Sequence, residues 1–311
     1  MEQKYNIAVI GGGPAGYVAA IRGSQLGAKV VLFEQDSVGG TCLNRGCIPT
    51  KTYLKTAEYI KHIRAAAERG ILLDGRLRVD MPKAVQYKDK VVKTLTGGVS
   101  SLLKANHVDV VCGTAVLASE NAVQCGDMLY LADRILLCGG SAPSLPPLPG
   151  MDGRDVVTST ELLNGETCPE RLCILGGGVI GCELATVFRA FGSEVTIIEM
   201  AERIAPMFEK DISEEVAGCL RKDGVQLMLH TRAEKIETLE NGSSVVTDKG
   251  AVFCDTILVA TGRRPELSCL GSLTDKIRLD NGRIAVNEYL ETNIPGIYAC
   301  GDINGKLMLT H

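Results

Sequence analysis

The sequence lacks tryptophan altogether, and aromatic residues make up only 4% of its 311 residues. It also lacks any apolar run of about 18 residues, the length that a membrane-spanning helix needs. The first ten residues lead directly into a strand pattern, unlike the apolar stretch and cleavage site of a secretory signal peptide. These absences predict a soluble, cytoplasmic protein with no membrane partner.

The chain has no excess of positive charge: its net charge is −4, which argues against a nucleic-acid partner. Twelve cysteines are present, but they are scattered, with no C-x-x-C pair and no Cys/His cluster of zinc spacing. This pattern excludes a metal site and a secreted disulfide scaffold, so we expect most thiols to be reduced and buried. Cys168 and Cys173 stand five positions apart, but Cys173 lies in an apolar strand pattern, and we interpret both as structural.

A nucleotide-binding pattern occupies residues 5–34, which read as strand, glycine turn, helix and strand. Gly11, Gly13 and Gly16 form G-x-G-x-x-G directly after the strand and at the start of the helix. These glycines permit a tight turn, a close approach of phosphate to the backbone, and close packing of helix on strand. Glu34 ends the second strand, 34 − 11 = 23 residues after the first glycine, where a carboxylate can accept from ribose hydroxyls. Ordinary packing of a helix on a sheet is the alternative interpretation.

The same pattern recurs after a proline-rich stretch at residues 141–150, which reads as a stiff linker. Gly176, Gly178 and Gly181 repeat the motif, and Glu199 again follows the first glycine by 199 − 176 = 23 residues. Two copies of one unit in one chain predict two bound dinucleotides.

The second copy also bears on the choice of nicotinamide. A carboxylate such as Glu199 accepts from a 2′-hydroxyl and repels a 2′-phosphate, whereas an NADP site favours arginines. Arg203 is the only cation near it in the sequence. We therefore expect NAD rather than NADP.

Between the two copies lies GGTCLNRGCIPTK, Gly39–Lys51, with Cys42 and Cys47 five positions apart at an expected loop-to-helix junction. Thiols at this spacing can form a local disulfide, and a helix N-terminus favours a thiolate over a thiol. Thr41 or Asn44 is expected to cap the helix. Two buried structural cysteines in an ordinary helix are the alternative.

The remaining stretches predict the other elements. A second helix is expected from Met81 to about residue 108, interrupted by Gly97 and Gly98. Residues 108–138 then resemble a strand meander that returns to the first sheet, and residues 297–303 resemble its closing strand. Asp302 follows a glycine there, which is also a common turn pattern.

The string around Cys42 and Cys47 resembles the redox-active segment of the FAD-dependent pyridine nucleotide-disulfide oxidoreductases, and the resemblance covers the whole chain. It implies that Cys42 exchanges with a dithiol substrate and that Cys47 faces the flavin as a charge-transfer thiolate. It further implies that Lys51 lies near the flavin and pairs with Glu183. The catalytic residues implied are thus Cys42, Cys47, Lys51 and Glu183.

The resemblance implies FAD at the first copy and NAD at the second. The residues expected around FAD are Gly11, Gly13, Pro14, Ala15, Gly16, Glu34, Gly40, Thr41, Lys51, Gly140, Asp302, Met308 and Leu309. Those expected around the second copy and at the crossing back toward the flavin domain are Gly176, Gly178, Ile180, Gly181, Glu199 and Gly262. Where family members carry Ala-Thr-Gly, this chain has Cys138, Gly139 and Gly140, which weakens one flavin contact.

The fold class implied is α/β, with two Rossmann-like FAD/NAD(P)-binding domains that contain parallel sheets, the second inserted in the first. We expect residues 1–145 and 270–311 to form the FAD domain with the redox disulfide, and residues 146–269 the NAD domain. Family members continue into a C-terminal dimerisation domain whose histidine and glutamate take a proton from the substrate. That domain is expected to be absent here, because none of His62, His107, His230 and His311 is followed by a glutamate at the family spacing.

The function implied is oxidation of protein-bound dihydrolipoamide to lipoamide, with reduction of NAD. The partners implied are the lipoyl domain of a 2-oxo acid, acetoin or glycine-cleavage complex, and a second copy in a full-length homodimer. As a truncated form, the chain is expected to have little lipoamide turnover. Two alternatives stay open: another flavin disulfide reductase, acting on mercuric ion or a low-molecular-weight disulfide, or a flavoprotein module with NADH-acceptor activity only.

Overall fold

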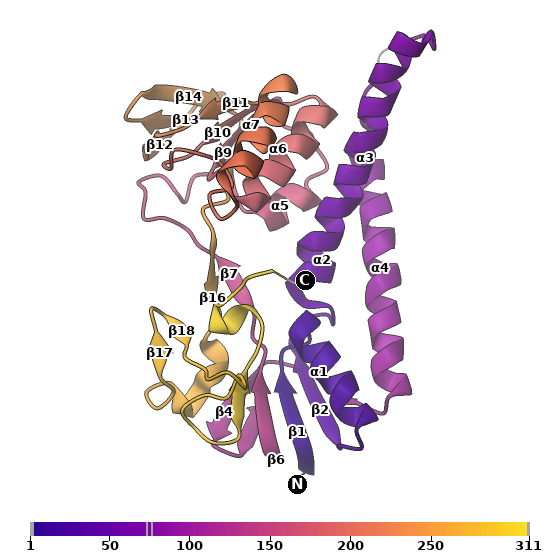
Figure 1. Cartoon of the computed structure of the whole chain (residues 1–311), viewed down its shortest axis with the longest axis vertical. Coiled ribbons are helices and arrows are strands. Elements are labelled where there is room, and N and C mark those ends of the chain that lie inside the picture. Colours follow the sequence, from indigo (N-terminus) through magenta and orange to yellow (C-terminus); the bar gives the residue numbers. More distant parts are fainter. Residues whose placement is uncertain (1–2, 73, 76, 310–311) are drawn as a thin grey trace. The chain divides into compact units, whose positions relative to one another are not determined.

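The computed structural model describes residues 3–72, 74–75 and 77–309, so His311 lies outside the described residues. Figure 1 labels most of its helices and strands. The chain divides into two compact units: Met1–Cys47, Val92–Ala142 and Arg263–His311 form the first, and Ile48–Val91 and Pro143–Gly262 the second. The domain boundaries expected at residues 145 and 269 stay a prediction.

The first unit is built on a seven-stranded sheet of order β3-β2-β1-β6-β5-β4, with β19 paired to β6. The pairs β1–β2, β1–β6, β2–β3 and β6–β19 are parallel, and β4 and β5 complete an antiparallel meander with β6. The strands are β1 Gln3–Ile10, β2 Val30–Glu34, β3 Asp109–Cys112, β4 Ala115–Ser119, β5 Ala122–Cys125, β6 Met128–Leu137 and β19 Ile297–Ala299.

One part of the meander prediction was wrong. Asp109–Cys112 does not begin the meander but pairs in parallel with β2 at the end of the sheet. A helix precedes β3, and a helical crossover allows the chain to return in the parallel direction. The meander therefore starts at Ala115.

The helices of the N-terminal half are α1 Pro14–Gln25, α2 Gly40–Arg45, α3 Cys47–Ala65 and α4 Met81–Ala105, with a 3₁₀ helix η1 at Ala66–Arg69. The interruption expected at Gly97 and Gly98 was wrong, because α4 continues through both. Glycine costs about 1 kcal/mol in a helix interior relative to alanine, which a 25-residue helix with good helix formers around it can tolerate.

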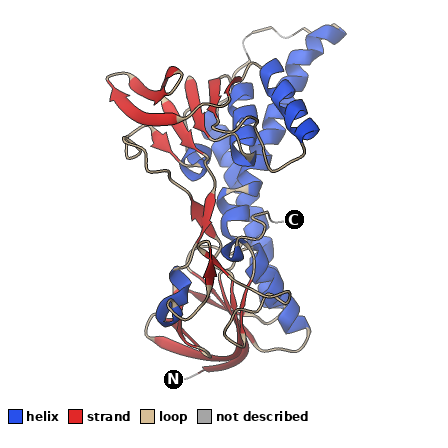
Figure 2. Ribbon diagram, turned by 60° about the vertical axis from the view of Figure 1, so that its left-hand side comes forward, coloured by secondary structure: helices blue, strands red, loops and turns tan. Residues whose placement is uncertain are grey.

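The second unit contains a five-stranded parallel sheet of order β11-β10-β9-β15-β8. Helices α6 and α7 lie on one side of it and the antiparallel sheet β12-β13-β14 on the other, as Figure 2 shows. The elements are β8 Val156–Val157, α5 Ser159–Asn164, β9 Arg171–Leu175, α6 Val179–Phe191, β10 Glu194–Ile198, α7 Lys210–Lys222, β11 Gln226–Met228, β12 Ala233–Leu239, β13 Gly242–Thr247, β14 Gly250–Cys254 and β15 Thr256–Val259.

Short elements complete the fold. They are β7 Ser141–Pro143 paired with β16 Arg263–Pro265, β17 Leu279–Asp280 paired with β18 Arg283–Ile284, and the 3₁₀ helices η2 Ser268–Leu273 and η3 Asp302–Asn304. No helix within the described ranges is long and apolar enough to cross a membrane.

Candidate functional site

The glycine turn between β1 and α1 accepts no larger residue at two positions. A Cβ at Gly11 would lie 2.2 Å from the carbonyl oxygen of Cys138, and a Cβ at Gly16 would lie 1.8 Å from the carbonyl oxygen of Gly11. Gly13 is the N-cap of α1 and supplies no side-chain cap. Because the first N–H groups of a helix lack partners within it, this N-terminus can hold an anionic group such as a pyrophosphate.

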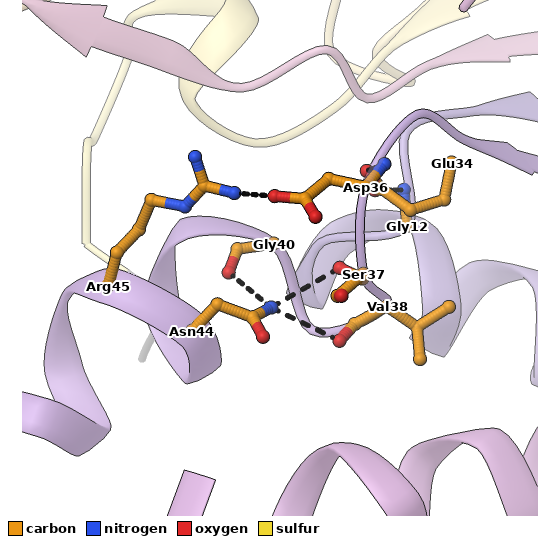
Figure 3. Close-up of polar contacts among 8 residues, drawn as sticks. All are labelled: Gly12, Glu34, Asp36, Ser37, Val38, Gly40, Asn44 and Arg45. Carbon is orange, nitrogen blue, oxygen red and sulfur yellow. Dashed lines mark hydrogen bonds and ion pairs between the residues drawn. The ribbon is translucent and has the colours of Figure 1, made fainter. Parts of the chain in front are cut away.

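Glu34 lies at the end of β2 with its carboxylate bound to the same turn (Figure 3). The N–H of Gly12 donates to Oε2 at 2.8 Å, and the N–H of Asp36 donates to Oε1 at 3.0 Å. A carboxylate has about four acceptor positions, so each oxygen can accept a further hydrogen bond. The backbone thus fixes Glu34 in a position suited to a ribose diol.

The second copy reproduces this geometry. The N–H of Gly177 donates to Oε2 of Glu199 at 2.7 Å, and the N–H of Ala201 donates to Oε1 at 2.8 Å. Gly178 is the uncapped N-cap of α6, and a Cβ built on it would meet no atom within 4 Å. Arg203 donates to the carbonyl of Pro206. The second turn therefore has the carboxylate that suits NAD, with open space beside its N-terminus.

Close to Glu199, burial raises the pKa of Cys182 to about 11, and the negative charges of Glu199 and Glu183 act in the same direction. Cys182 is 8% exposed and donates to the carbonyl of Gly177 at 3.4 Å. We therefore interpret it as a neutral packing residue of the second turn.

The segment that carries the two expected redox cysteines contacts the first glycine turn. Gly40 has a φ of +55°, and a Cβ there would lie 2.6 Å from Cα of Gly13. The amide nitrogen of Asn44 donates to the carbonyls of Ser37, Val38 and Gly40 at 3.0 to 3.2 Å, and Arg45 pairs with Asp36 (Figure 3).

The capping prediction for Thr41 or Asn44 was wrong. Gly39, with a φ of +103°, is the N-cap of α2 and makes no side-chain cap. Asn44 instead satisfies carbonyl groups of the preceding loop. The side-chain amide of Asn44 stabilises the loop because it donates to carbonyl oxygens, whereas an N-cap side chain would accept from backbone N–H groups.

Cys42 lies within α2, and Cys47 is the first residue of α3, with Gly46 between the two helices. Both cysteines are half-buried. The position of Cys47 at a helix N-terminus favours its thiolate form. Beside them, burial raises the pKa of Tyr17, and the negative charge of Cys42 adds to this effect.

The other ten cysteines are free thiols. Cys168 lies 3.4 Å from the hydroxyl of Ser193, and Cys173 is fully buried in β9. Burial raises the pKa of Cys168. Cys168 and Cys173 therefore do not form the disulfide that their spacing alone would have allowed.

The ion pair expected between Lys51 and Glu183 is present, with Nζ and Oε1 2.7 Å apart. The Lys51 side chain is 51% exposed and that of Glu183 25% exposed. The pair joins the early part of α3 to α6 within the second unit. Its role beside a flavin stays a prediction.

Asp302 is the first residue of η3, and its neighbour Gly301 lies against the start of α1: a Cβ at Gly301 would be 3.0 Å from Cβ of Ala15. Its Oδ2 accepts from the hydroxyl of Ser141 at 2.5 Å. The hydroxyl of Ser141 also accepts from Arg263. Ser141 and Arg263 are not among the site residues expected from the sequence, although Ser141 directly follows Gly140 and Arg263 directly follows Gly262.

The remaining expected residues are less closely tied to the turns. Ile180 packs on the core of the second unit, and Thr41 is exposed. Gly140 and Gly262 have positive φ angles of +74° and +115°. Pro14 begins α1, while Met308 and Leu309 lie in the irregular segment after η3, Leu309 being 40% exposed. Among the described residues, no group of three His, Cys, Asp or Glu side chains is placed to hold a metal ion.

Each copy has a helix N-terminus without a side-chain cap, glycines at which a Cβ would clash, and a carboxylate fixed by backbone N–H groups. These features fit a bound dinucleotide at each copy. Residues 5–311 match the sequence profile of a family described as pyridine nucleotide-disulphide oxidoreductase. The chain is 42% identical over 315 residues to a dihydrolipoyl dehydrogenase of Acholeplasma laidlawii, covering 100% of this chain and 93% of the relative.

Further relatives are similar over a smaller share of their length. A dihydrolipoyl dehydrogenase of Bacillus subtilis is 38% identical, with 98% of this chain and 68% of the relative covered. Among solved structures, the Cu(II) complex of the HOCl-induced flavoprotein disulfide reductase RclA from Escherichia coli is similar, with a TM-score of 0.88 and 33% identity. That match covers 99% of this chain and 68% of the other.

Proposed function

We propose, from the premise that this chain belongs to the pyridine nucleotide-disulphide oxidoreductase family, that it oxidises protein-bound dihydrolipoamide with NAD as the final acceptor. The observation that supports this most directly is the pairing of two matching dinucleotide turns with a cysteine pair next to the first. The family is FAD-dependent and acts on sulfur groups with NAD(H), and relatives at 36–42% identity are named dihydrolipoyl dehydrogenase.

In the proposed reaction, a substrate thiolate attacks the sulfur of Cys42 in the oxidised pair, forms a mixed disulfide and releases Cys47 as a thiolate. The second substrate thiol then attacks the mixed disulfide, which releases lipoamide and leaves Cys42 and Cys47 reduced. The N-terminus of α3 stabilises the negative charge of Cys47 in both steps.

When bound, FAD accepts the two electrons of the reduced pair and passes hydride to NAD. The residues of the first turn would hold the pyrophosphate and Glu34 the adenosine ribose, while Asp302 would hold the ribityl chain. Lys51, kept in place by Glu183, would supply positive charge next to the flavin ring. Glu199 and the turn from Gly176 to Gly181 would bind NAD.

The second dinucleotide is expected to be NADH rather than NADPH. Replacing Glu199 by alanine removes the acceptor for the 2′-hydroxyl and the repulsion of a 2′-phosphate. A hydrogen bond to a charged group contributes about 1.5–3 kcal/mol, so the preference should narrow about ten- to a hundredfold. Titration of both nucleotides against the wild type and the variant measures this, with Glu194→Ala on the exposed start of β10 as control. Equal affinity of the wild type for NADH and NADPH would contradict the assignment.

A second candidate is reduction of a different disulfide or of an oxidised small molecule. The structural similarity to a flavoprotein disulfide reductase, at 33% identity, supports it. The two candidates share the cysteine pair and differ in the electron acceptor. Comparing NAD reduction by dihydrolipoamide with NADH oxidation by small disulfides, on one preparation, distinguishes them.

The partners proposed are the lipoyl domain of a 2-oxo acid, acetoin or glycine-cleavage complex and a second copy in a full-length homodimer. We place the protein in the cytoplasm, since ten free thiols are typical of a reducing compartment.

The absorption spectrum of the purified chain tests the proposed function. With FAD added and the excess removed, we expect a flavin spectrum that gains long-wavelength charge-transfer absorbance when dihydrolipoamide is added. A chain that binds no FAD, or bound FAD that dihydrolipoamide leaves unchanged, would refute the proposal.

A further inference from the structure

Three polar side chains of the first unit form a continuous hydrogen-bonded chain. Arg263, in β16, donates from Nε to the hydroxyl of Ser141 at 2.7 Å and from Nη2 to the carbonyl of Ser141 at 2.6 Å. The hydroxyl of Ser141, in β7, donates to Oδ2 of Asp302 at 2.5 Å. β7 and β16 pair as a two-stranded sheet, labelled in Figure 1.

The direction of each hydrogen bond is determined by chemistry. A guanidinium can only donate and an ionised carboxylate can only accept, so the Ser141 hydroxyl must accept from Arg263 and donate to Asp302. Charge-assisted bonds of this kind are about twice as strong as neutral ones. The hydroxyl therefore has one orientation, and Oδ2 of Asp302 is engaged.

The other oxygen of Asp302 is left for a ligand. In the described part of the chain, no hydrogen bond engages Oδ1, while the backbone of η3 holds the residue through the bond from Gly305 N–H to the Asp302 carbonyl at 3.0 Å. Gly301, next to Asp302, lies against Ala15 at the start of α1. Oδ1 thus belongs to a carboxylate fixed beside the helix that carries the first dinucleotide turn.

Arg263 is itself held in a demanding environment. Burial lowers the pKa of Arg263, while the negative charges of Asp302 and Cys47 act in the opposite direction. A partly buried cation needs acceptors, and the hydroxyl and carbonyl oxygens of Ser141 supply two of them.

We propose that Ser141 and Arg263 are positioning residues that fix the Asp302 carboxylate so that Oδ1 accepts from a hydroxyl of the ribityl chain of FAD. This inference rests on the proposed function, because it names the FAD group that Asp302 would bind. A preorganised acceptor strengthens binding because less conformational freedom is lost when the ligand arrives. Neither residue need contact FAD for the effect to occur.

A double-mutant cycle on FAD affinity tests this. We expect Ser141→Ala to weaken FAD binding about tenfold, which corresponds to about 1.4 kcal/mol, and Asp302→Ala to weaken it further. If Ser141 acts through Asp302, the double variant should bind FAD no more weakly than Asp302→Ala alone. Flavin fluorescence on titration of the apoprotein gives the dissociation constants.

Matched variants separate positioning from general destabilisation. Arg263→Gln should weaken FAD binding, whereas Arg264→Gln, the same change at the exposed neighbouring residue, should not. Arg263→Lys and Ser141→Thr retain the charge and the hydroxyl and should restore part of the affinity. Circular dichroism of each apoprotein checks that it is folded.

Two outcomes would overturn the inference. Additive losses in the cycle, with wild-type FAD binding intact, would show that Ser141 acts independently of Asp302 and would leave the proposed function standing. No FAD binding by the wild type would refute the proposed function and this inference together.

Discussion

Replacing Cys47 by serine is expected to abolish the charge-transfer band and to slow the reduction of bound FAD by dithiol on the order of a thousandfold or more. The reason is that Cys47 begins α3, where the helix N-terminus favours the thiolate, and serine has no thiolate to offer. Stopped-flow absorbance after dihydrolipoamide is added to the FAD-loaded chain measures both effects.

The companion variant distinguishes the two cysteines. Cys42→Ser should also stop disulfide exchange, but it leaves Cys47 as a thiolate, so the charge-transfer colour should be present without any dithiol. Cys168→Ser is the matched control, because Cys168 stands in a second C-x-x-x-x-C string and should change neither property. Thiol counts after denaturation, with and without prior reduction, should differ by two in the wild type. A band that persists in Cys47→Ser would assign the charge-transfer role to another thiol.

The second large effect is expected at the glycines of the second turn, where different glycines serve the packing of the helix on the strand and the approach of the ligand. A Cβ at Gly181 would lie 2.1 Å from the carbonyl oxygen of Gly176, so Gly181→Ala forces α6 away from β9. Overpacking of this kind costs up to about 3 kcal/mol, and we expect that loss in the free energy of unfolding, together with loss of NADH binding. Denaturant titration and NADH titration measure the two quantities.

Gly178→Ala is the matched substitution without a steric clash. A Cβ at Gly178 would meet no atom within 4 Å, and the φ of −70° at this position suits alanine. We expect its unfolding free energy to change by less than about 1 kcal/mol, the scale of an N-cap substitution. NADH binding should still weaken, because the added methyl group would occupy the space beside the uncapped N-terminus of α6. Equal stability of the two variants would refute the packing role of Gly181.

Much of the candidate site could be predicted from the sequence because its determinants are local. Gly11, Gly16 and Glu34 lie within one strand, turn, helix and strand, and the backbone geometry of that unit brings the carboxylate to Gly12. The second copy obeys the same constraints, so Glu199 meets Gly177 in the same way. Lys51 and Glu183 stand 132 residues apart in the chain, and their ion pair was expected from the family resemblance alone.

Local patterns were less informative where several local preferences compete. Gly97 and Gly98 predicted an interruption of the helix, but the good helix formers around them outweigh the glycine penalty, and α4 continues. Asn44 has the chemistry of an N-cap, yet it donates to loop carbonyls, because the left-handed backbone of Gly39 already starts α2. The continuation of α4 and the role of Asn44 each depend on a sum of several small free energies, and a sequence pattern does not show which contribution is largest.

By itself, the sequence determined the two glycine turns, their carboxylates and the cysteine pair, since each depends on residues close together in the chain. Only the tertiary structure decided that Ser141, Arg263 and Asp302 form one hydrogen-bonded chain. Arg263 stands 122 positions and Asp302 161 positions after Ser141 in the chain. Their contact requires β7 to pair with β16 and η3 to return beside α1, and no local pattern carries the information for pairings across that separation.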